Sequence, residues 1–229
     1  MARNRSHKTR RIAGNDSVVV IGMGRFGRAL ALELVDEDTE VLGIDENPEV
    51  VQLLSGSLTH VVRADSTKED VLRQLAVHEF NRAVVAIGTD LEASILTASL
   101  LVSFGIQDVW AKAISEAHGR ILTQLGVQHV VYPEHDMGQR VAHLVRGRML
   151  DYIEFEDDFA MAKTNPPADI IGKRLADSAV RSRYGLTVVA IKRPGEGFTY
   201  ATADTIVQAG DTIIVAGRTR QTERFSELQ

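Results

Sequence analysis

The sequence predicts an α/β protein in which a doubly wound parallel sheet is followed by a small α+β domain. From Ser17 to Tyr132, short β-branched runs alternate with stretches of helical apolar spacing, the order that a parallel sheet with helices on both faces requires. The segment Gly22–Gly27 (GMGRFG) ends the first apolar run and opens a helix. Asp45 closes the next apolar run, about twenty positions further on. Together these observations are typical of a Rossmann-type sheet.

Six strands and a crossover helix follow from this alternation. The apolar runs predict strands at Val18–Ile21, Val41–Ile44, His60–Arg63, Ala83–Ile87, Val109–Ala111 and His129–Val131. Trp110 is expected in the core. A crossover helix is predicted over Glu134–Leu150, beyond the last strand. Its apolar stripe either folds back on its own domain or crosses to a partner, and consists of Met137, Val141, Leu144, Val145 and Met149.

A change in composition predicts a domain boundary near Asp151, ahead of the acidic run Glu154–Asp158. We divide the chain into a disordered basic tail (1–16), a nucleotide-binding domain with the crossover helix (17–150) and a C-terminal dimerisation domain (151–229), to which the resemblance described below adds a regulatory role. Strands are predicted in the last domain at Thr187–Lys192, Phe198–Ala201 and Thr212–Ala216. About eighty residues is small for independent stability, so dimerisation is expected.

Composition excludes several classes of function. The 229 residues contain no cysteine, which rules out disulfides, thiolate nucleophiles and cysteine-ligated metal centres and fits a reducing cytoplasm. The formal net charge is −5, so no overall basic field favours nucleic acid. No apolar run approaches the roughly 18 residues of a membrane span. We interpret the basic stretch Met1–Asp16 as a solvated tail rather than an arm for RNA or lipid head groups, because no aromatic residue lies between its charges.

The glycines of the first turn have separate roles in a phosphate site. Gly22 is expected at the tight turn, Gly24 where the backbone approaches a pyrophosphate, and Gly27 where the helix packs on the strand. The phosphates would lie against free N–H groups at the positive end of the helix. Asp45 is placed to accept hydrogen bonds from ribose hydroxyls, and its charge disfavours the 2′-phosphate of NADP. The alternative is a merely structural glycine turn.

Arg25 follows Gly24 directly, where its guanidinium could reach terminal phosphate oxygens and distinguish ATP from ADP. The alternative is a surface arginine in the first helical turn. Phe26, in the same turn, is also assigned to the cofactor site.

Four further residues are assigned to the crevice at the carboxyl ends of the strands. Asp65 and Ser66 end the third strand beside the adenosine end, although an Asp at this point is equally a helix cap. Asn47 leaves the same two interpretations open. Lys112 would face the crevice from the fifth strand and meet a phosphate or a base. The alternative is a lysine with a buried stem at a strand end.

The ordered motifs of the chain resemble those of RCK domains, which form the cytoplasmic, nucleotide-gated regulatory subunits of Ktr and Trk potassium uptake systems. The resemblance covers nearly the whole chain. Its motifs are Gly22–Gly27, Asp45–Pro48, Ala64–Thr67, Trp110–Ala113, Tyr132–Gly138, Ile171–Lys173, Tyr184–Arg193 and Ala209–Asp211. The segment Pro133–Gly138 looks more like the Ktr branch, and the chain has one regulatory unit rather than the two fused units of many Trk subunits.

The resemblance implies a homodimer that assembles into an octameric ring through the crossover helix and docks on a membrane potassium-translocating subunit at the inner face of the plasma membrane. It implies ATP or ADP in the crevice, with NAD or NADH as the alternative ligand. It makes Glu134 a candidate ligand of magnesium or another cation, through the phosphate; the plain alternative is an acid in a first helical turn. Some relatives bind cyclic di-AMP at the C-terminal domain, where the residues in question here are Ile170, Ile171, Arg181 and Tyr184.

The leading hypothesis is a regulator rather than an enzyme, in which adenine nucleotide shifts the ring between two conformations that the membrane subunit senses. The second hypothesis is an NAD-dependent oxidoreductase, but the C-terminal segment offers no convincing acid/base pair. The third is an NAD(H)-sensing redox regulator, in one form a DNA-binding repressor. The acidic net charge and the lack of a helix-turn-helix segment count against DNA binding.

Overall fold

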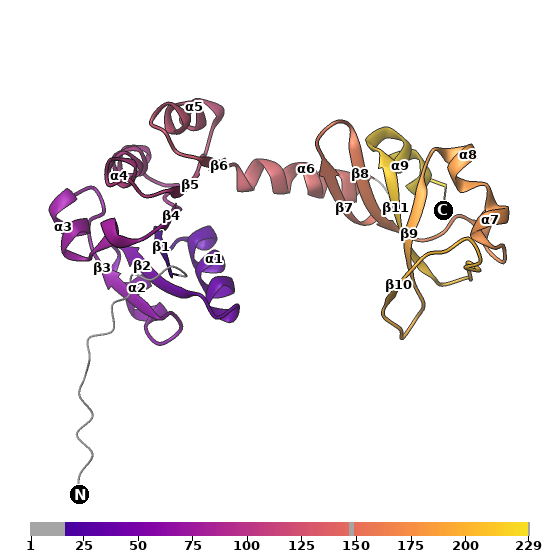
Figure 1. Cartoon of the computed structure of the whole chain (residues 1–229), viewed down its shortest axis with the longest axis horizontal. Helices are drawn as coiled ribbons and strands as arrows, with labels where there is room; N and C mark the ends of the chain where they lie inside the picture. Colours follow the sequence, from indigo (N-terminus) through magenta and orange to yellow (C-terminus); the bar gives the residue numbers. More distant parts are fainter. Residues whose placement is uncertain (1–16, 147–148, 229) are drawn as a thin grey trace, which may run out of the picture. The chain divides into compact units, whose positions relative to one another are not determined.

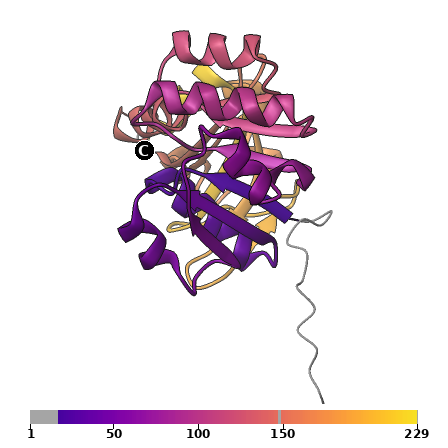
Figure 2. The same cartoon turned by 90° about the vertical axis from the view of Figure 1, so that its left-hand side faces the viewer.

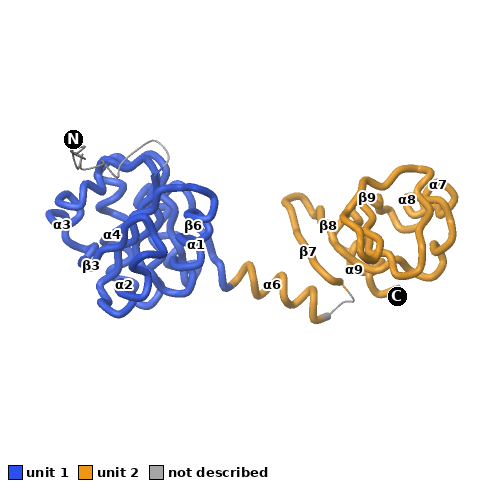
Figure 3. The backbone as a smooth tube through the Cα atoms, turned by 90° about the horizontal axis from the view of Figure 1, so that it is seen from below, with its two compact units in different colours: residues 1–134 blue, residues 135–229 orange. Residues whose placement is uncertain are grey.

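A computed structural model describes residues 17–146 and 149–228 of the chain (Figure 1). The predicted tail over 1–16 lies outside the described residues. The chain divides into two compact units, residues 1–134 and 135–229 (Figure 3). Most of helix α6 (Pro133–Arg146) is therefore grouped with the second unit, whereas the sequence-based division assigns the crossover helix to the first domain. A functional boundary near Asp151 stays a prediction.

The first unit is built on a six-stranded parallel sheet in the order β3-β2-β1-β4-β5-β6. Its strands are β1 (Ser17–Ile21), β2 (Glu40–Asp45), β3 (His60–Arg63), β4 (Arg82–Val85), β5 (Asp108–Lys112) and β6 (His129–Val131). All six predicted strands are confirmed, although β4 ends at Val85 rather than Ile87. The strand order reverses between β1 and β4, the point at which doubly wound sheets bind ligands.

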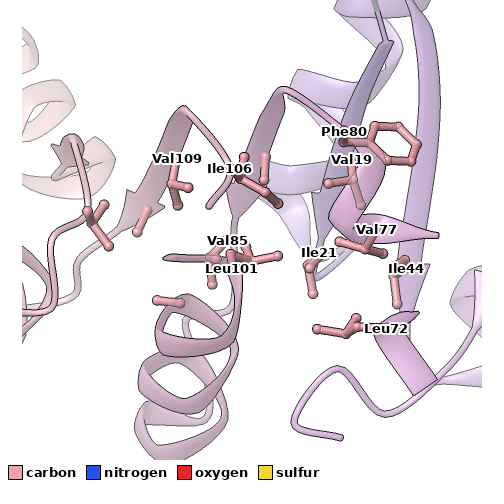
Figure 4. Close-up of a cluster of buried hydrophobic side chains, with 14 of the residues drawn as sticks. Val19, Ile21, Ile44, Leu72, Val77, Phe80, Val85, Leu101, Ile106 and Val109 are labelled. Atoms are coloured by element: carbon pink, nitrogen blue, oxygen red, sulfur yellow. The ribbon is translucent and has the colours of Figure 1, made fainter. Parts of the chain in front are cut away.

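Helices cover both faces of this sheet (Figure 2). They are α1 (Arg25–Asp36), α2 (Pro48–Leu54), α3 (Glu69–Gln74), α4 (Leu91–Ser103) and α5 (Glu116–Gln124), with a 3₁₀ turn η1 (Val77–Glu79). Successive side chains of a strand point to opposite faces. Val19 and Ile21 therefore join the cluster on the side of α3, α4 and α5 (Figure 4), whereas Val18 and Val20 join the cluster on the side of α1 and α2. This is why β1 is apolar at every position from Val18 to Ile21.

Trp110 does not lie in the core as expected. Its side chain is 38% exposed, its ring stacks on His129 with 4.1 Å between centroids, and its Nε1–H donates to Asp108 Oδ1 at 2.9 Å. The two stacked residues are paired across β5 and the edge strand β6. Trp110 is exposed because the sheet ends beside it.

The second unit contains a five-stranded antiparallel sheet in the order β10-β9-β11-β8-β7. Its strands are β7 (Met149–Phe155), β8 (Phe159–Thr164), β9 (Thr187–Lys192), β10 (Phe198–Tyr200) and β11 (Thr212–Arg218). The helical elements are η2 (Ala168–Ile170), α7 (Leu175–Ser178), α8 (Val180–Tyr184) and α9 (Thr219–Ser226). The core brings Ile213 and Val215 of β11 together with Phe225 of α9, and Leu144 of α6 packs against it. The three predicted C-terminal strands are confirmed.

The hairpin of β7 and β8 corrects the expected end of the crossover helix. The sequence predicts helix to Leu150, but α6 ends at Arg146 and β7 begins at Met149. The acidic run that suggested a boundary forms the exposed end of β7 and the turn, where Asp157 and Asp158 adopt φ values of 60° and 57°. The strand was hidden because only Met149 and Tyr152 of β7 are buried, which leaves little apolar alternation.

Replacing Ile170 by alanine is expected to lower the free energy of unfolding by about 2–5 kcal/mol, because its side chain is 0% exposed and belongs to the core of the second unit. The neighbouring Ile171 is 37% exposed, so Ile171→Ala should cost less than about 1 kcal/mol and is the matched control. Denaturant unfolding followed by circular dichroism measures both. Equal losses would contradict this assignment of the core.

Candidate functional site

A cavity of about 790 Å³ lies in the first unit at the carboxyl ends of the parallel strands. Its wall is made by the segments that follow β1, β2, β3, β4 and β5, together with Glu134. The carboxyl ends of parallel strands meet at one edge of the sheet, so these five segments converge where the strand order reverses. The cavity therefore occupies the place that the fold reserves for a ligand.

Ten of the eleven predicted site residues line this cavity. They are Gly22, Gly24, Arg25, Phe26, Asp45, Asn47, Asp65, Ser66, Lys112 and Glu134. The eleventh, Gly27, is buried behind the turn. The structure thus brings the predicted residues together, and their roles toward a ligand stay predictions.

Steric limits explain two of the three glycines. Gly22 has a φ of +92°, and a Cβ there would lie 2.9 Å from the backbone N of Ile87. A Cβ on Gly27 would lie 1.9 Å from the carbonyl oxygen of Gly22, so only glycine lets α1 start this close to β1. Gly24 differs, because a Cβ there would meet no protein atom within 4 Å. Gly24 is the N-cap of α1 without a side-chain cap, and the first turn of α1 contains no acid. The free N–H groups at the helix N-terminus are therefore available to an anion.

Asp45 holds the glycine turn in place. Its Oδ2 accepts a hydrogen bond from Met23 N at 2.6 Å, and its Oδ1 accepts one from Asn47 N at 2.8 Å. The sequence does not predict this second role. A carboxylate oxygen has more than one acceptor direction, so ribose hydroxyls can still donate to Asp45.

The cap interpretation is confirmed for Asn47 but not for Asp65. Asn47 is the N-cap of α2, and its Oδ1 accepts from Glu49 N at 2.9 Å. Asp65 instead closes the turn before α3, where its Oδ1 accepts from both Thr67 Oγ1 (2.6 Å) and Thr67 N (2.9 Å). These hydrogen bonds hold the pKa of Asp65 below its usual value. Asp65 is therefore an anion at the exposed end of the cavity.

Ser66 is buried, and its hydroxyl shares a 2.8 Å hydrogen bond with Thr97 Oγ1 of α4. The side chain thus connects the turn after β3 to α4. This is a structural role that the sequence did not suggest.

Lys112 and Glu134 form an ion pair at the opposite end of the cavity. The Nζ atom of Lys112 lies 2.5 Å from Glu134 Oε1, and the two side chains are 11% and 65% exposed. The hydrogen bond from Lys112 lowers the pKa of Glu134, and the positive charge of Arg25 acts in the same direction. The cavity wall therefore carries carboxylates beside β2 and β3, with Lys68 next to them, and the cations Arg25 and Lys112 beside α1 and β5. Asp90 and Glu92 line the wall after β4.

Gly88, Leu96 and Ile114 line the cavity without having been predicted. A Cβ on Gly88 would lie 3.1 Å from Lys112 Nζ, so this glycine makes room for the ammonium group. Leu96 and Ile114 are 44% and 50% exposed and present apolar surface to the cavity. The signal for Gly88 was its position in the segment that follows β4, at the reversal of the strand order.

The described residues, 17–146 and 149–228, contain no group of three or more His, Cys, Asp or Glu side chains that could hold a metal ion. Glu134 as a cation ligand would thus need oxygens from a phosphate, and this role stays a prediction. Within the same part of the chain, no helix is both long enough and apolar enough to cross a membrane.

Comparisons with known proteins identify the class. The TrkA-N domain family matches residues 18–133, and the TrkA-C domain family matches residues 160–229. The chain belongs to the RCK family of potassium transport proteins, which are built from these two domains.

Within that family, the chain is similar to subunits of the Ktr system. It is 34% identical to Ktr system potassium uptake protein C of Bacillus subtilis (strain 168), covering 91% of this chain and 95% of the relative. It is 33% identical to protein A of the same organism, with 92% and 96% covered. Ktr system potassium uptake protein A of Vibrio alginolyticus is also 33% identical, with 89% and 93% covered.

Solved structures confirm the fold. The GsuK RCK domain superposes with a TM-score of 0.66 at 18% identity, covering 94% of this chain and 48% of that one. The GsuK channel bound to NAD gives 0.65 at 18% identity, covering 93% and 39%. The chain spans less than half the length of these solved chains.

Replacing Gly27 by alanine is expected to lower the free energy of unfolding by about 1–3 kcal/mol, because the new methyl group would overlap the carbonyl of Gly22. Gly24→Ala places the same methyl group in open space, so it should change stability by less than about 1 kcal/mol. Thermal and denaturant unfolding compare the two variants. A Gly24→Ala protein as unstable as Gly27→Ala would contradict the described turn.

Proposed function

We propose that the chain is a nucleotide-binding regulatory subunit of a potassium uptake system, in which ATP and ADP favour different conformations of a ring assembly. The observation that carries the proposal is the order of charges along the cavity wall. Asp45 and Asp65 lie at one end, the open N-terminus of α1 lies between, and Arg25 and Lys112 lie at the other. Ribose hydroxyls suit the carboxylates, and phosphates suit the helix N-terminus and the cations.

A binding role fits the side chains of the cavity better than catalysis does. Asp45 is engaged by two backbone N–H groups and Lys112 by Glu134. Neither is poised as a free acid or base, so we propose a regulator and not an enzyme.

An NAD(H)-sensing regulator is the second candidate function, and an NAD(H)-dependent oxidoreductase is the third. The exposed apolar surface that Leu96 and Ile114 present to the cavity suits a second nucleoside, and a protein of the same fold is described as bound to NAD.

The membrane partner we propose is a potassium-translocating subunit of the Ktr or Trk type. The support is that three relatives, 33–34% identical to this chain, are named as parts of Ktr uptake systems. In this proposal the chain acts at the cytoplasmic face of the membrane and reaches the bilayer only through that partner. Nucleic acid has no part in it.

The assembly we propose is a homodimer that builds an octameric ring. Helix α6 supports it, because its apolar residues divide between two faces. Leu144 packs on the core of the second unit, whereas Met137, Val141 and Val145 are 53%, 45% and 80% exposed. Residues four apart share one face of a helix, so these three form a stripe that a second copy can cover.

Cyclic di-AMP binding at the C-terminal domain remains a proposal, but fewer of the residues named for it are open to a ligand. Ile171 and Arg181 are exposed. Ile170 is buried in the core and so does not offer the apolar wall expected of it. The hydroxyl of Tyr184 donates to Asp169 Oδ2 at 2.6 Å.

Arg25→Ala is expected to lower the affinity for ATP by about tenfold and the affinity for ADP much less, because only the terminal phosphate of ATP would lose a charge-assisted hydrogen bond. Asp45→Asn should weaken both nucleotides, and its stability must be measured too because Asp45 also holds the glycine turn. Titration calorimetry with ATP, ADP and NAD measures each affinity. Arg28→Ala is the matched control, an exposed arginine of the same helix outside the cavity wall. If Arg25→Ala lowers the affinities for ATP and ADP equally, Arg25 does not recognise the terminal phosphate. If NAD binds more tightly than either adenine nucleotide, the second candidate is favoured.

Val141→Glu is expected to break the assembly into smaller species, because it places a charge in the apolar stripe of α6. Ala142→Glu adds the same charge to the next exposed position, about 100° around the helix, and should leave the assembly intact. Light scattering after gel filtration reports the mass of each. Dissociation of both variants, or of neither, would argue against this stripe as the interface.

A further inference from the structure

We propose that His143 is a pH-dependent link within the second unit. As an imidazolium it ties helix α6 to both β7 and α9, and as a neutral ring it releases the tie to β7. The inference goes beyond the proposed function, because it requires no nucleotide. It concerns the helix whose apolar stripe is proposed to meet a second copy, so it would make that helix responsive to protons.

The ring of His143 lies between carboxylates of two different elements. Its Nδ1 is 2.8 Å from Glu223 Oε1 of α9, and its Nε2 is 3.9 Å from Glu154 Oε2 of β7. The side chains of His143 and Glu223 are only 24% and 26% exposed, so salt screens this contact less than it screens a fully exposed pair. Tyr152 of β7 stacks on one face of the ring, with 4.3 Å between the ring centroids and 29° between the planes. These three neighbours determine where each ring nitrogen points.

The two carboxylates favour the protonated ring. A neutral imidazole has one N–H group, so it can donate from Nδ1 to Glu223 while Nε2 turns a lone pair toward Glu154. An imidazolium has an N–H group on both nitrogens and therefore attracts both carboxylates. Histidine is the side chain that ordinarily changes its charge between about pH 5 and 8. The contact with Glu154 therefore depends on pH within this range.

The other titratable and charged groups beside the ring do not change with it. Burial raises the pKa of Tyr152 to about 12, so its phenol stays neutral. Asp136 and Arg140 of α6 line a groove together with His143. The Nη2 atom of Arg140 lies 2.5 Å from Asp151 Oδ1 of β7, and this hydrogen bond lowers the pKa of Asp151. The contact between Arg140 and Asp151 is therefore charged throughout the same range.

Helix α6 is thus held by one permanent and one conditional charged contact. Arg140, His143 and Leu144 are three or four residues apart and share one face of the helix, and Leu144 packs on the core of the second unit. The stabilisation by the charged form of His143 is present at low pH and is lost as the pH rises through its titration, because the folded chain binds that form more tightly. At higher pH the helix keeps Arg140 and Leu144 and can pivot about them.

The test measures the position of α6 within the second unit of the full chain. The sequence contains no cysteine, so Ala142→Cys on α6 and Val189→Cys on β9, both exposed, can carry the only two spin labels. Dipolar electron spin resonance, with labelled chains diluted into unlabelled ones, gives the distribution of distances between the labels. We expect a narrow distribution at pH 6 and a broader or shifted one at pH 8. His143→Gln should give the pH 8 distribution at both values, and Glu154→Gln should reduce the difference between them.

Thermal unfolding followed by circular dichroism is the second measurement, and it also detects misfolding. His143→Gln should lower the unfolding midpoint by about 2–4 °C at pH 6 and by less than half as much at pH 8. His135→Gln is the matched control, because His135 belongs to the same helix and its ring contacts Asp136 and Gln139 of that helix. This variant should keep the full pH effect on the distance.

The proposal is overturned if the distances in the otherwise unaltered labelled chain are the same at both pH values. It is also overturned if the pH effect survives in His143→Gln or disappears in His135→Gln. If His143→Gln does not fold, Glu154→Gln decides, and an undiminished pH effect in that variant overturns the proposal.

Discussion

The contact between Gly27 and the carbonyl of Gly22 is the constraint on which the site depends. Because no side chain separates them, α1 begins directly at the end of β1. Asp45 then holds the intervening turn by accepting a hydrogen bond from Met23 N. The N-terminus of α1 is therefore packed against the turn after β1 on one side and open toward the cavity on the other. It has no side-chain cap that would compete with an anion.

The charged side chains around this helix N-terminus differ between the two sides of the cavity. Asp45 and Asp65 lie on the side of β2 and β3, where Lys68 also lines the wall, and Arg25 and Lys112 lie on the side of α1 and β5. The basic side is not left uncompensated, since Glu134 pairs with Lys112. A site arranged in this way can distinguish ligands by the amount and position of their charge, which is the property a nucleotide-controlled regulator needs.

Most of the sheet and most of the site could be predicted because their signals are local. β-branched runs mark the strands, and the spacing of Gly22, Gly24 and Gly27 marks the turn. The features that could not be predicted depend on partners distant in the sequence. Ser66 hydrogen-bonds Thr97, and Lys112 pairs with Glu134, yet no periodicity joins either pair. The β7–β8 hairpin was not predicted, because its strands are stabilised by pairing within the second sheet rather than marked by an apolar pattern of their own.

Strand β1 contributes alternate side chains to two separate hydrophobic clusters, one on each face of the sheet. A substitution in β1 therefore always disturbs a packed interior, and the insertion or loss of one residue would exchange the two sets. The strand that leads into the site therefore has little room to accept a change of side chain. The segments after β3 and β5 are different, since Asp65 and Ile114 are exposed. Homologous chains can diverge in ligand preference through these two segments while β1 and its glycine turn stay the same.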